Sequence, residues 1–281
     1  MQEIGRSIIR LESVDSTNNY TANRARENDL RHGAVILAVE QTAGKGQMGA
    51  HWQSDAGANL TFSVFLNNVN LSAERQFLLT KIVSLSLVDL LGSFGISAKI
   101  KWPNDIYVDN RKIAGVLIEN IIQGKTISKT IIGIGLNVNQ QEFGLLSATS
   151  LSLEKRMHFS LDDVLFSFIG AFNKRLKGME SASIHEDYHQ LLFWLNESRR
   201  FKDEQGEFEG ALVGINERGM LLVESGLREP QLSVCASSTT SSVQRTPFLA
   251  LPACIKVRMA LIVAPCRPMT LPMSVGCRRS S

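Results

Sequence analysis

The sequence predicts an α+β domain that is followed by a small β-barrel-like module. Three observations support this prediction. Apolar runs of strand length, such as Ala34 to Glu40, recur through the first half of the chain. Between them, Ser72 to Phe94 carries apolar residues at helical spacing. From Arg199 to Ser225, short strand-like segments are joined by turns that contain Gly and Asn.

The N-terminal elements follow from local composition. Ser7 to Val14 predicts a strand that runs into Asp15-Ser16-Thr17-Asn18, a cluster of residues that favour helix N-caps, and a polar helix then extends to about Asn28. Asn59 to Leu66 alternates apolar and polar residues, as a half-buried strand does.

The central elements are longer. Ala98 to Trp102 predicts a short strand that ends at Pro103, because proline cannot donate to a strand ladder. Two long neighbouring strands are expected at Lys112 to Ile122 and Thr130 to Val138, followed by helices at Leu161 to Lys177 and Ile184 to Asn196.

These elements divide the chain into an α+β domain at 1–195, a small β module at 196–229 and an atypical tail at 230–281. The tail carries six Lys/Arg and no Asp or Glu, whereas residues 1–229 carry 24 basic and 27 acidic side chains. The net charge of +3 therefore comes from the tail and does not indicate a nucleic-acid surface. The tail is either an authentic extension or a segment read in the wrong frame after about Arg228, which would leave the β module incomplete.

Composition also excludes several classes of protein. Hydrophobic residues make up 44% and charged residues 20% of the chain, which is ordinary for a globular protein. We see neither an uninterrupted apolar run of about 18 residues nor a secretory signal, so we expect a cytoplasmic protein without a membrane segment. All four cysteines lie in the tail without CxxC spacing, so neither a zinc ribbon nor a disulfide framework is expected in the body.

The glycine-rich segment between Gln41 and Trp52 is the first candidate for a ligand site. Gly44, Gly46 and Gly49 would let the backbone approach an anion and point N–H groups at it, and Lys45 would add a positive charge. The segment lacks the GK[ST] of a phosphate-binding P-loop. An ordinary surface loop is the alternative.

The second candidate is Lys101-Trp102-Pro103-Asn104-Asp105, which is followed by Lys112 and Gly115. Lysines at the end of a strand would neutralise phosphate oxygens, and the carboxylate or amide would bind Mg²⁺ or a ribose hydroxyl. A hairpin turn with solvated charges is the alternative.

Two further motifs place polar groups beside apolar ones. In Gly133-Ile134-Gly135-Leu136-Asn137, glycines inside an apolar strand usually mark the close approach of a ligand or of backbone, and Asn137 would need a polar partner. Ser16-Thr17-Asn18 on its own is more often a helix cap than a binding site.

Taken in order, STN, QTAGKGQMGAHW, KWPNDIYVDNRKIAG and GIGLNVN resemble the catalytic domain of the biotin–protein ligases. The resemblance spans Ile8 to Val138 by motif. It implies an α+β domain similar to the class II synthetases, in which a mixed, mostly antiparallel sheet packs with helices, and an SH3-like C-terminal barrel. It also implies an enzyme that forms biotinyl-5′-adenylate from biotin and ATP with Mg²⁺, and then transfers biotin to a lysine of a biotin carboxyl carrier domain.

The resemblance also implies roles for individual residues. Lys101 would stabilise the phosphate and Lys112 the biotin carboxylate, and these two are the expected catalytic residues. Asp105 and Asn137 would hold the metal ion. The residues expected to bind biotin or the nucleotide are Ser16, Thr17, Asn18, Gln41, Gly44, Lys45, Gly46, Gln47, Gly49, Asn104, Asp105, Gly115 and Asn137.

This chain departs from the family pattern in its glycine-rich loop. Family members often read GRGRRG where this sequence reads GKGQMG, so Lys45 keeps a charge without the bidentate fork of arginine, and Gln47 and Met48 keep neither. The family's DNA-binding helix-turn-helix has no counterpart before the first expected strand. We therefore expect a ligase that does not bind DNA, either a monomer or a homodimer.

Two other functions are compatible with these residues. A lipoate–protein ligase shares the fold and the adenylate chemistry. A non-catalytic biotin- or nucleotide-binding protein would bind its ligand without turning over ATP.

Overall fold

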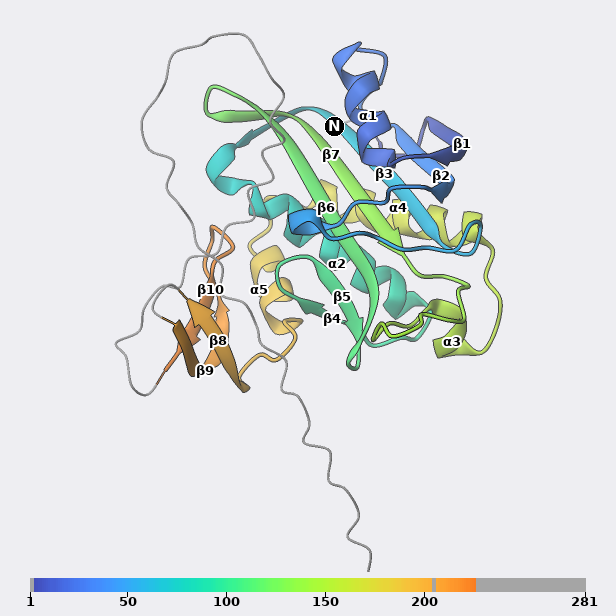
Figure 1. Ribbon diagram of the computed structural model, residues 1–281. Coiled ribbons are helices and arrows are strands. Elements are labelled where there is room, and N and C mark those ends of the chain that lie inside the picture. The colour runs from blue at the N-terminus through green and yellow to red at the C-terminus, as the bar shows by residue number, and fades with distance from the viewer. Residues whose placement is uncertain (1–2, 204–205, 226–281) are drawn as a thin grey trace, which may run out of the picture.

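The computed structural model describes residues 3–203 and 206–225, which form a large sheet covered by helices and a smaller C-terminal sheet (Figure 1). The tail at 230–281, with its cysteines and the question of its reading frame, lies outside the described residues.

The large sheet has seven strands in the order β1-β2-β3-β7-β6-β5-β4. Strands β1 and β2 pair in parallel, and every other neighbouring pair is antiparallel, which confirms the predicted mixed, mostly antiparallel sheet. The strands are β1 (Ile8–Val14), β2 (Val35–Gln41), β3 (Leu60–Ser72), β4 (Lys99–Lys101), β5 (Asp105–Val108), β6 (Arg111–Gln123) and β7 (Thr126–Leu136).

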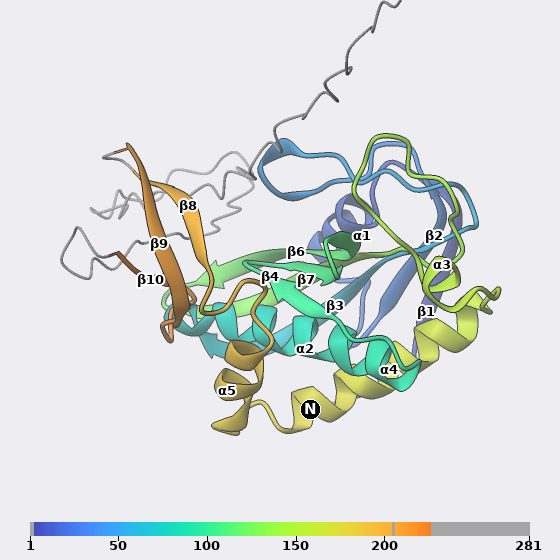
Figure 2. The same cartoon turned by 90° about the horizontal axis from the view of Figure 1, so that it is seen from below.

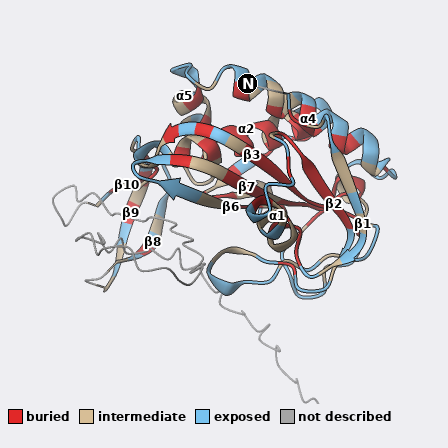
Figure 3. Cartoon of the chain, turned by 90° about the horizontal axis from the view of Figure 1, so that it is seen from above, coloured by how far each residue is buried: buried red, intermediate tan, exposed pale blue. Residues whose placement is uncertain are grey.

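Helices lie on both faces of this sheet (Figure 2), and its central strands β3 and β7 are buried along most of their length. Alternate residues of a strand point to opposite faces. Val35 therefore belongs to the main core beneath α2 (Phe77–Ser93), whereas Ile36 belongs to a smaller core beneath α1 (Thr17–Arg26). Figure 3 shows the result, with β2, β3 and β7 buried along most of their length.

The helical layer below the sheet is formed by α2, α4 (Leu161–Lys177) and α5 (Ser183–Gln190). By length and composition Ala73–Ser93 could cross a membrane, but most of this segment is buried inside the protein, as expected for a core helix. The short helices η1 (Gln47–Gly49), η2 (Ala73–Arg75) and α3 (Leu151–Lys155) lie in connections.

The C-terminal sheet is antiparallel, with the order β10-β9-β8, and it packs directly on the large domain. Its strands are β8 (Ser198–Asp203), β9 (Gly206–Ile215) and β10 (Leu221–Glu224). The indole of Trp102 donates a 2.7 Å hydrogen bond to the carbonyl of Gly219, and Phe201 and Leu212 join the main core. Because one core spans both sheets, the division at residue 195 stays a prediction.

The segment between α5 and β8, here called the 191–197 linker, corrects the predicted helix at Ile184 to Asn196. The helix ends at Gln190. Ile100 of β4 then exchanges two backbone hydrogen bonds of 2.8 Å with Leu191 and Phe193, so the linker lies along the outer edge of β4. The apolar residues that extended the helical pattern are used to cover this edge.

Candidate functional site

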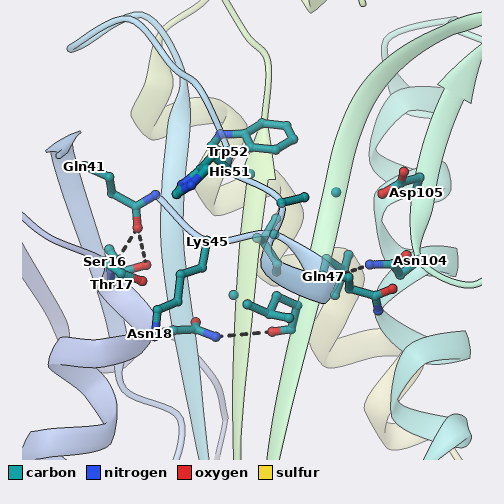
Figure 4. A pocket seen from close by; sticks show the side chains of 18 of the residues that line it. Ser16, Thr17, Asn18, Gln41, Lys45, Gln47, His51, Trp52, Asn104 and Asp105 are labelled. Atoms are coloured by element: carbon teal, nitrogen blue, oxygen red, sulfur yellow. Dashed lines mark hydrogen bonds between the residues drawn. The ribbon is translucent and has the colours of Figure 1, made fainter. Parts of the chain in front are cut away.

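A cavity of about 260 Å³ opens on the face of the large sheet that carries α1 (Figure 4). The start of α1, the loop after β2 and strands β5, β6 and β7 all contribute to it. It brings together eleven of the predicted site residues, which are Ser16, Thr17, Asn18, Gln41, Lys45, Gly46, Gln47, Asn104, Asp105, Lys112 and Gly115. Four predicted site residues do not line it, namely Gly44, Gly49, Lys101 and Asn137.

One end of the cavity, at the start of α1, is lined mainly by uncharged side chains that form hydrogen bonds. The side-chain carbonyl of Gln41 accepts from the backbone N–H of Thr17 at 2.8 Å and from its hydroxyl at 3.1 Å. Gln41 thus serves the first turn of α1, while Ser16 at the N-cap makes no side-chain capping hydrogen bond. The alternative that Ser16 only caps the helix does not describe this arrangement, and its buried hydroxyl lines the cavity instead.

Two residues that sequence reasoning missed fix the amide of Asn18. The hydroxyl of Ser63, fully buried on β3, lies 2.7 Å from both the Asn18 side-chain carbonyl and the Thr17 hydroxyl. The Asn18 amide nitrogen donates to a carboxylate oxygen of Glu119 at 2.7 Å. Because the alternation of β3 sends Phe62 into the main core, its polar neighbour Ser63 points to the cavity side. That signal could have identified it.

The two strand glycines make room for side chains of the site. A Cβ atom on Gly133 would lie 2.4 Å from the Asn18 amide oxygen, and one on Gly135 would lie 2.2 Å from the Trp52 ring. Real Cβ atoms essentially never approach other heavy atoms within 3.0 Å. The predicted close approach at this strand is therefore made by Asn18 and Trp52.

Trp52 forms a wall of the cavity between its uncharged and charged ends. Its ring lies against β7 at Gly135, and the ammonium of Lys112 sits 5.6 Å from the ring centroid. The indole N–H is buried and has no hydrogen-bond partner within the described part of the chain. An aromatic face with an unpaired donor suits a ligand that is apolar along its length and carries polar groups.

The charged end holds an ion pair between Lys112 and Asp105, whose atoms Nζ and Oδ1 are 2.8 Å apart. Strand β5, a segment for which the sequence analysis predicted no element, presents Asp105 opposite Gly115 of β6. A Cβ atom on Gly115 would lie 3.2 Å from Lys112 Nζ, so the glycine leaves space for this lysine to reach the cavity.

Lys101 lies beside the cavity, close enough to act electrostatically on its charged end. Burial lowers the pKa of its ammonium, Asp105 raises that pKa, and the like charge of Lys112 lowers it. The ammonium is 4.9 Å from the ring centroid of Tyr107 and 5.2 Å from that of Trp194. These two rings orient the ammonium of Lys101, which the sequence analysis expected at the phosphate.

The asparagines have different surroundings. Asn104 lines the cavity, but its amide nitrogen is engaged with the carbonyl of Val116. Asn137 is buried outside the lining. Its amide nitrogen donates to the carbonyl of Thr149 at 3.0 Å, and its amide oxygen has no partner among the described residues.

The two predicted metal ligands therefore do not share a cavity wall. Asp105 lies on β5, and Asn137 directly follows β7. Because β6 lies between these two strands, their backbones are two strand spacings apart, about 10 Å. Among the described residues there is no cluster of three His, Cys, Asp or Glu side chains able to hold a metal ion. In the described part of the chain, Asp105 is the one carboxylate that lines the cavity.

The glycine-rich loop crosses the cavity between Trp52 and α1 (Figure 4). Lys45 pairs with His51 across the loop as an isolated β-bridge, and its ammonium bonds the amide oxygen of Asn19. Met48 adopts a φ of 53° and is 69% exposed. The loop thus directs Lys45 toward α1 and Met48 toward solvent.

Known proteins resemble this chain in both sequence and structure. A profile of the Biotin/lipoate A/B protein ligase family matches residues 11–137. A variant of the biotin protein ligase of Aquifex aeolicus, solved with biotin, is 30% identical, with a TM-score of 0.66 over 79% of this chain and 93% of that one. The chain belongs to the biotin and lipoate protein ligase family. It is therefore a ligase by descent, and the fold of its large sheet is that of the biotin protein ligases.

Two further comparisons agree. The Aquifex aeolicus ligase solved with biotin and ATP is 29% identical, with a TM-score of 0.68 over 81% of this ligase and 96% of that chain. The bifunctional ligase/repressor of Bacillus spizizenii is 29% identical over 231 residues, which is 79% of this chain and 70% of the relative.

Proposed function

We propose that this ligase activates biotin with ATP as biotinyl-5′-adenylate and transfers the biotin to a lysine of a biotin carboxyl carrier domain. The observation that supports the proposal best is the single cavity onto which all four motifs converge. The Aquifex aeolicus relative was solved with both biotin and ATP. We expect the reaction to take place in the cytoplasm.

The cavity suits biotin because its two ends differ in the same way as the two ends of that molecule. The ureido ring of biotin carries two N–H donors and a carbonyl acceptor, which match the hydroxyls and amides of Ser16, Thr17 and Asn18. The aliphatic chain would lie along Trp52. The carboxylate would then reach Lys112, at the opposite end from the uncharged groups.

In the first step, a carboxylate oxygen of biotin attacks the α-phosphorus of ATP, and the bond to pyrophosphate breaks. Both reactants are anionic, so their repulsion opposes the approach. The ammonium of Lys112 already lies at the charged end, and that of Lys101 is held nearby. These two positive charges would stabilise the additional negative charge of the transition state.

In the second step, the amine of the acceptor lysine attacks the carbonyl carbon of the adenylate, an amide forms and AMP leaves. The anhydride must be protected from water until the acceptor arrives. The glycine-rich loop, which crosses the cavity and includes the exposed Met48, is placed to cover it.

Magnesium, which usually accompanies ATP, would be held mainly by the triphosphate. The residues present fit a single protein ligand, Asp105, because Mg²⁺ in phosphoryl transfer commonly takes one or two carboxylates together with phosphate oxygens. The position of Asn137 outside the cavity does not fit a second ligand. The ion would neutralise phosphate charge, in addition to the lysines.

The decisive experiment is biotin-dependent exchange of radiolabelled pyrophosphate into ATP, followed by transfer of biotin to a purified carrier domain. We expect Lys112→Ala to reduce the exchange by about 100-fold or more, the usual effect of removing a preorganised group that stabilises developing charge. Thermal unfolding should change little because Lys112 and Asp105 are both partly exposed. Near-normal exchange by Lys112→Ala would contradict its role.

The same assay separates the alternatives. Exchange that depends on lipoate and not on biotin would identify a lipoate–protein ligase. Biotin binding without any exchange would indicate a binding protein that has lost the chemistry.

A further inference from the structure

Lys101 carries its charge between two aromatic rings. Its ammonium lies 4.9 Å from the ring centroid of Tyr107, 5.2 Å from that of Trp194 and 3.5 Å from the Tyr107 hydroxyl. A cation at this distance from a ring is attracted by the ring's quadrupole, more strongly where water is partly excluded. The Lys101 side chain is half-buried, so the rings replace part of its hydration.

The two rings come from different parts of the fold. Tyr107 belongs to β5, which pairs with β4, the strand of Lys101. Trp194 belongs to the 191–197 linker that leads into the C-terminal sheet. Phe193 connects them, with its ring 5.3 Å from that of Tyr107 and 4.7 Å from that of Trp194. We call these three residues the aromatic cage of Lys101: Tyr107 and Trp194 face the ammonium, and Phe193 packs against both of their rings.

Trp194 is held in place from both sides. Its φ of 67° lies in the left-handed region, which is unfavourable for a bulky side chain and persists only where the surroundings determine it. On one side the linker is hydrogen-bonded to Ile100 of β4. On the other, Asn196 donates its backbone N–H to Leu212 of β9 at 2.7 Å, and the guanidinium of Arg199 lies 5.1 Å from the Trp194 ring.

We propose that Tyr107 and Trp194 are positioning residues for the first step of the reaction, because their rings hold the ammonium of Lys101 beside the charged end of the cavity. Through Trp194, the linker to the C-terminal sheet would then determine where this charge lies. This inference rests on the proposed function. Without the rings, the ammonium would gain solvation by turning outward, away from the like charge of Lys112, and the attraction of Asp105 would be the main interaction that opposes this movement.

The test compares the two half-reactions of the full-length chain. In Trp194→Leu and Tyr107→Leu we expect pyrophosphate exchange to fall about tenfold through kcat. The transfer of biotin from supplied biotinyl-5′-adenylate to the carrier domain should be unchanged, since Lys101 acts at the phosphate. Trp194→Phe, which keeps a ring, should recover most of the exchange. Arg200→Ala is the matched control, because this exposed cation on β8 lies outside the cage.

Coupling to Lys101 separates a positioning role from a general one. In a Lys101→Ala background, Trp194→Leu should cause no further loss of exchange, because the charge that it positions is gone. Equal losses in exchange and transfer, or full additivity with Lys101→Ala, would overturn the inference and indicate that Trp194 only supports the fold. Trp194→Gly relieves the left-handed backbone, so a Trp194→Gly variant that is stable and still exchanges normally would also refute it.

Failure of the proposed function would look different. If the unaltered chain shows no biotin-dependent exchange, the proposed function fails and the positioning role falls with it. If the chain exchanges pyrophosphate but Lys101→Ala does so at the same rate, the proposed role of Lys101 is wrong, and with it the purpose of the cage.

Discussion

Substituting Gly135 by alanine tests whether the wall formed by Trp52 is needed to bind the ligand. The new Cβ atom would lie 2.2 Å from Trp52 Cε2, more than 1 Å inside the 3.4 Å at which ordinary contact begins. Gly135 lies in β7, which is hydrogen-bonded to β3 and β6 on its two sides, whereas Trp52 is carried by a loop. We therefore expect the ring to move and the strand to stay.

The size of the effect follows from the cost of overpacking, which is typically about 1–3 kcal/mol for an inserted methyl group. If this cost falls on the wall of the cavity, the Kd for biotin should rise by about 5- to 150-fold. Because Trp52 belongs to a loop, its movement should change the midpoint of thermal unfolding much less than a distortion of strand β7 would.

Titration calorimetry with biotin and a thermal melt on the same samples measure both quantities. Gly170→Ala is the control, since a Cβ atom at this position would meet nothing within 4 Å and alanine favours a helix by up to about 1 kcal/mol. Normal biotin affinity in Gly135→Ala would refute the reasoning. The reasoning would also be refuted if Gly135→Ala lowered the biotin affinity of a Trp52→Ala variant by the same factor as it lowers that of the unaltered chain. The ring would then not transmit the effect.

Two other predictions follow from buried polar contacts. Ser63→Ala should weaken biotin binding by about tenfold, because the side chains of Thr17 and Asn18 lose the hydroxyl 2.7 Å away that orients them, and calorimetry should show this loss with biotin. The pKa of His185 is lowered, first by burial and then by the ammonium of Lys81, which donates to its Nδ1 at 2.8 Å. Its folded pKa is below the unfolded value of about 6.5, so this contribution to stability is complete above that pH and is lost as the pH falls toward the folded pKa. Melts between pH 5 and pH 8 should therefore show a steeper acid decline for the unaltered chain than for His185→Gln, and parallel curves would exclude this residue as the cause.

The sequence predicted the long elements well because their signals are repeated over many residues. The strands expected at Lys112 to Ile122 and Thr130 to Val138 correspond to β6 and β7, and the helix expected at Leu161 to Lys177 is α4. Apolar periodicity over ten or more residues is the most reliable local signal. The α+β fold class was predicted from apolar periodicity and the family from the order of the motifs, and the comparisons confirm both.

Short elements and long-range contacts were missed for physical reasons. Strand β5 has four residues and begins at Asp105, a residue that is uncommon in strands, so its composition gave no clear strand signal. Ser63 and Trp194 carry no motif, and their roles depend on strand pairing and on the path of a linker. The glycines of β7 were correctly interpreted as a close approach, but a sequence does not reveal that Asn18 and Trp52 are the groups that approach.

The contact between Trp102 and the turn at Gly219 affects how the protein unfolds. Phe77 of α2 lies under the same turn, so separating the small sheet would leave two aromatic side chains and an indole N–H without their neighbours. We expect residues 3–225 to melt in one cooperative transition. Proteolytic release of a stable fragment that ends near residue 195 would show that the small sheet is an independent appendage.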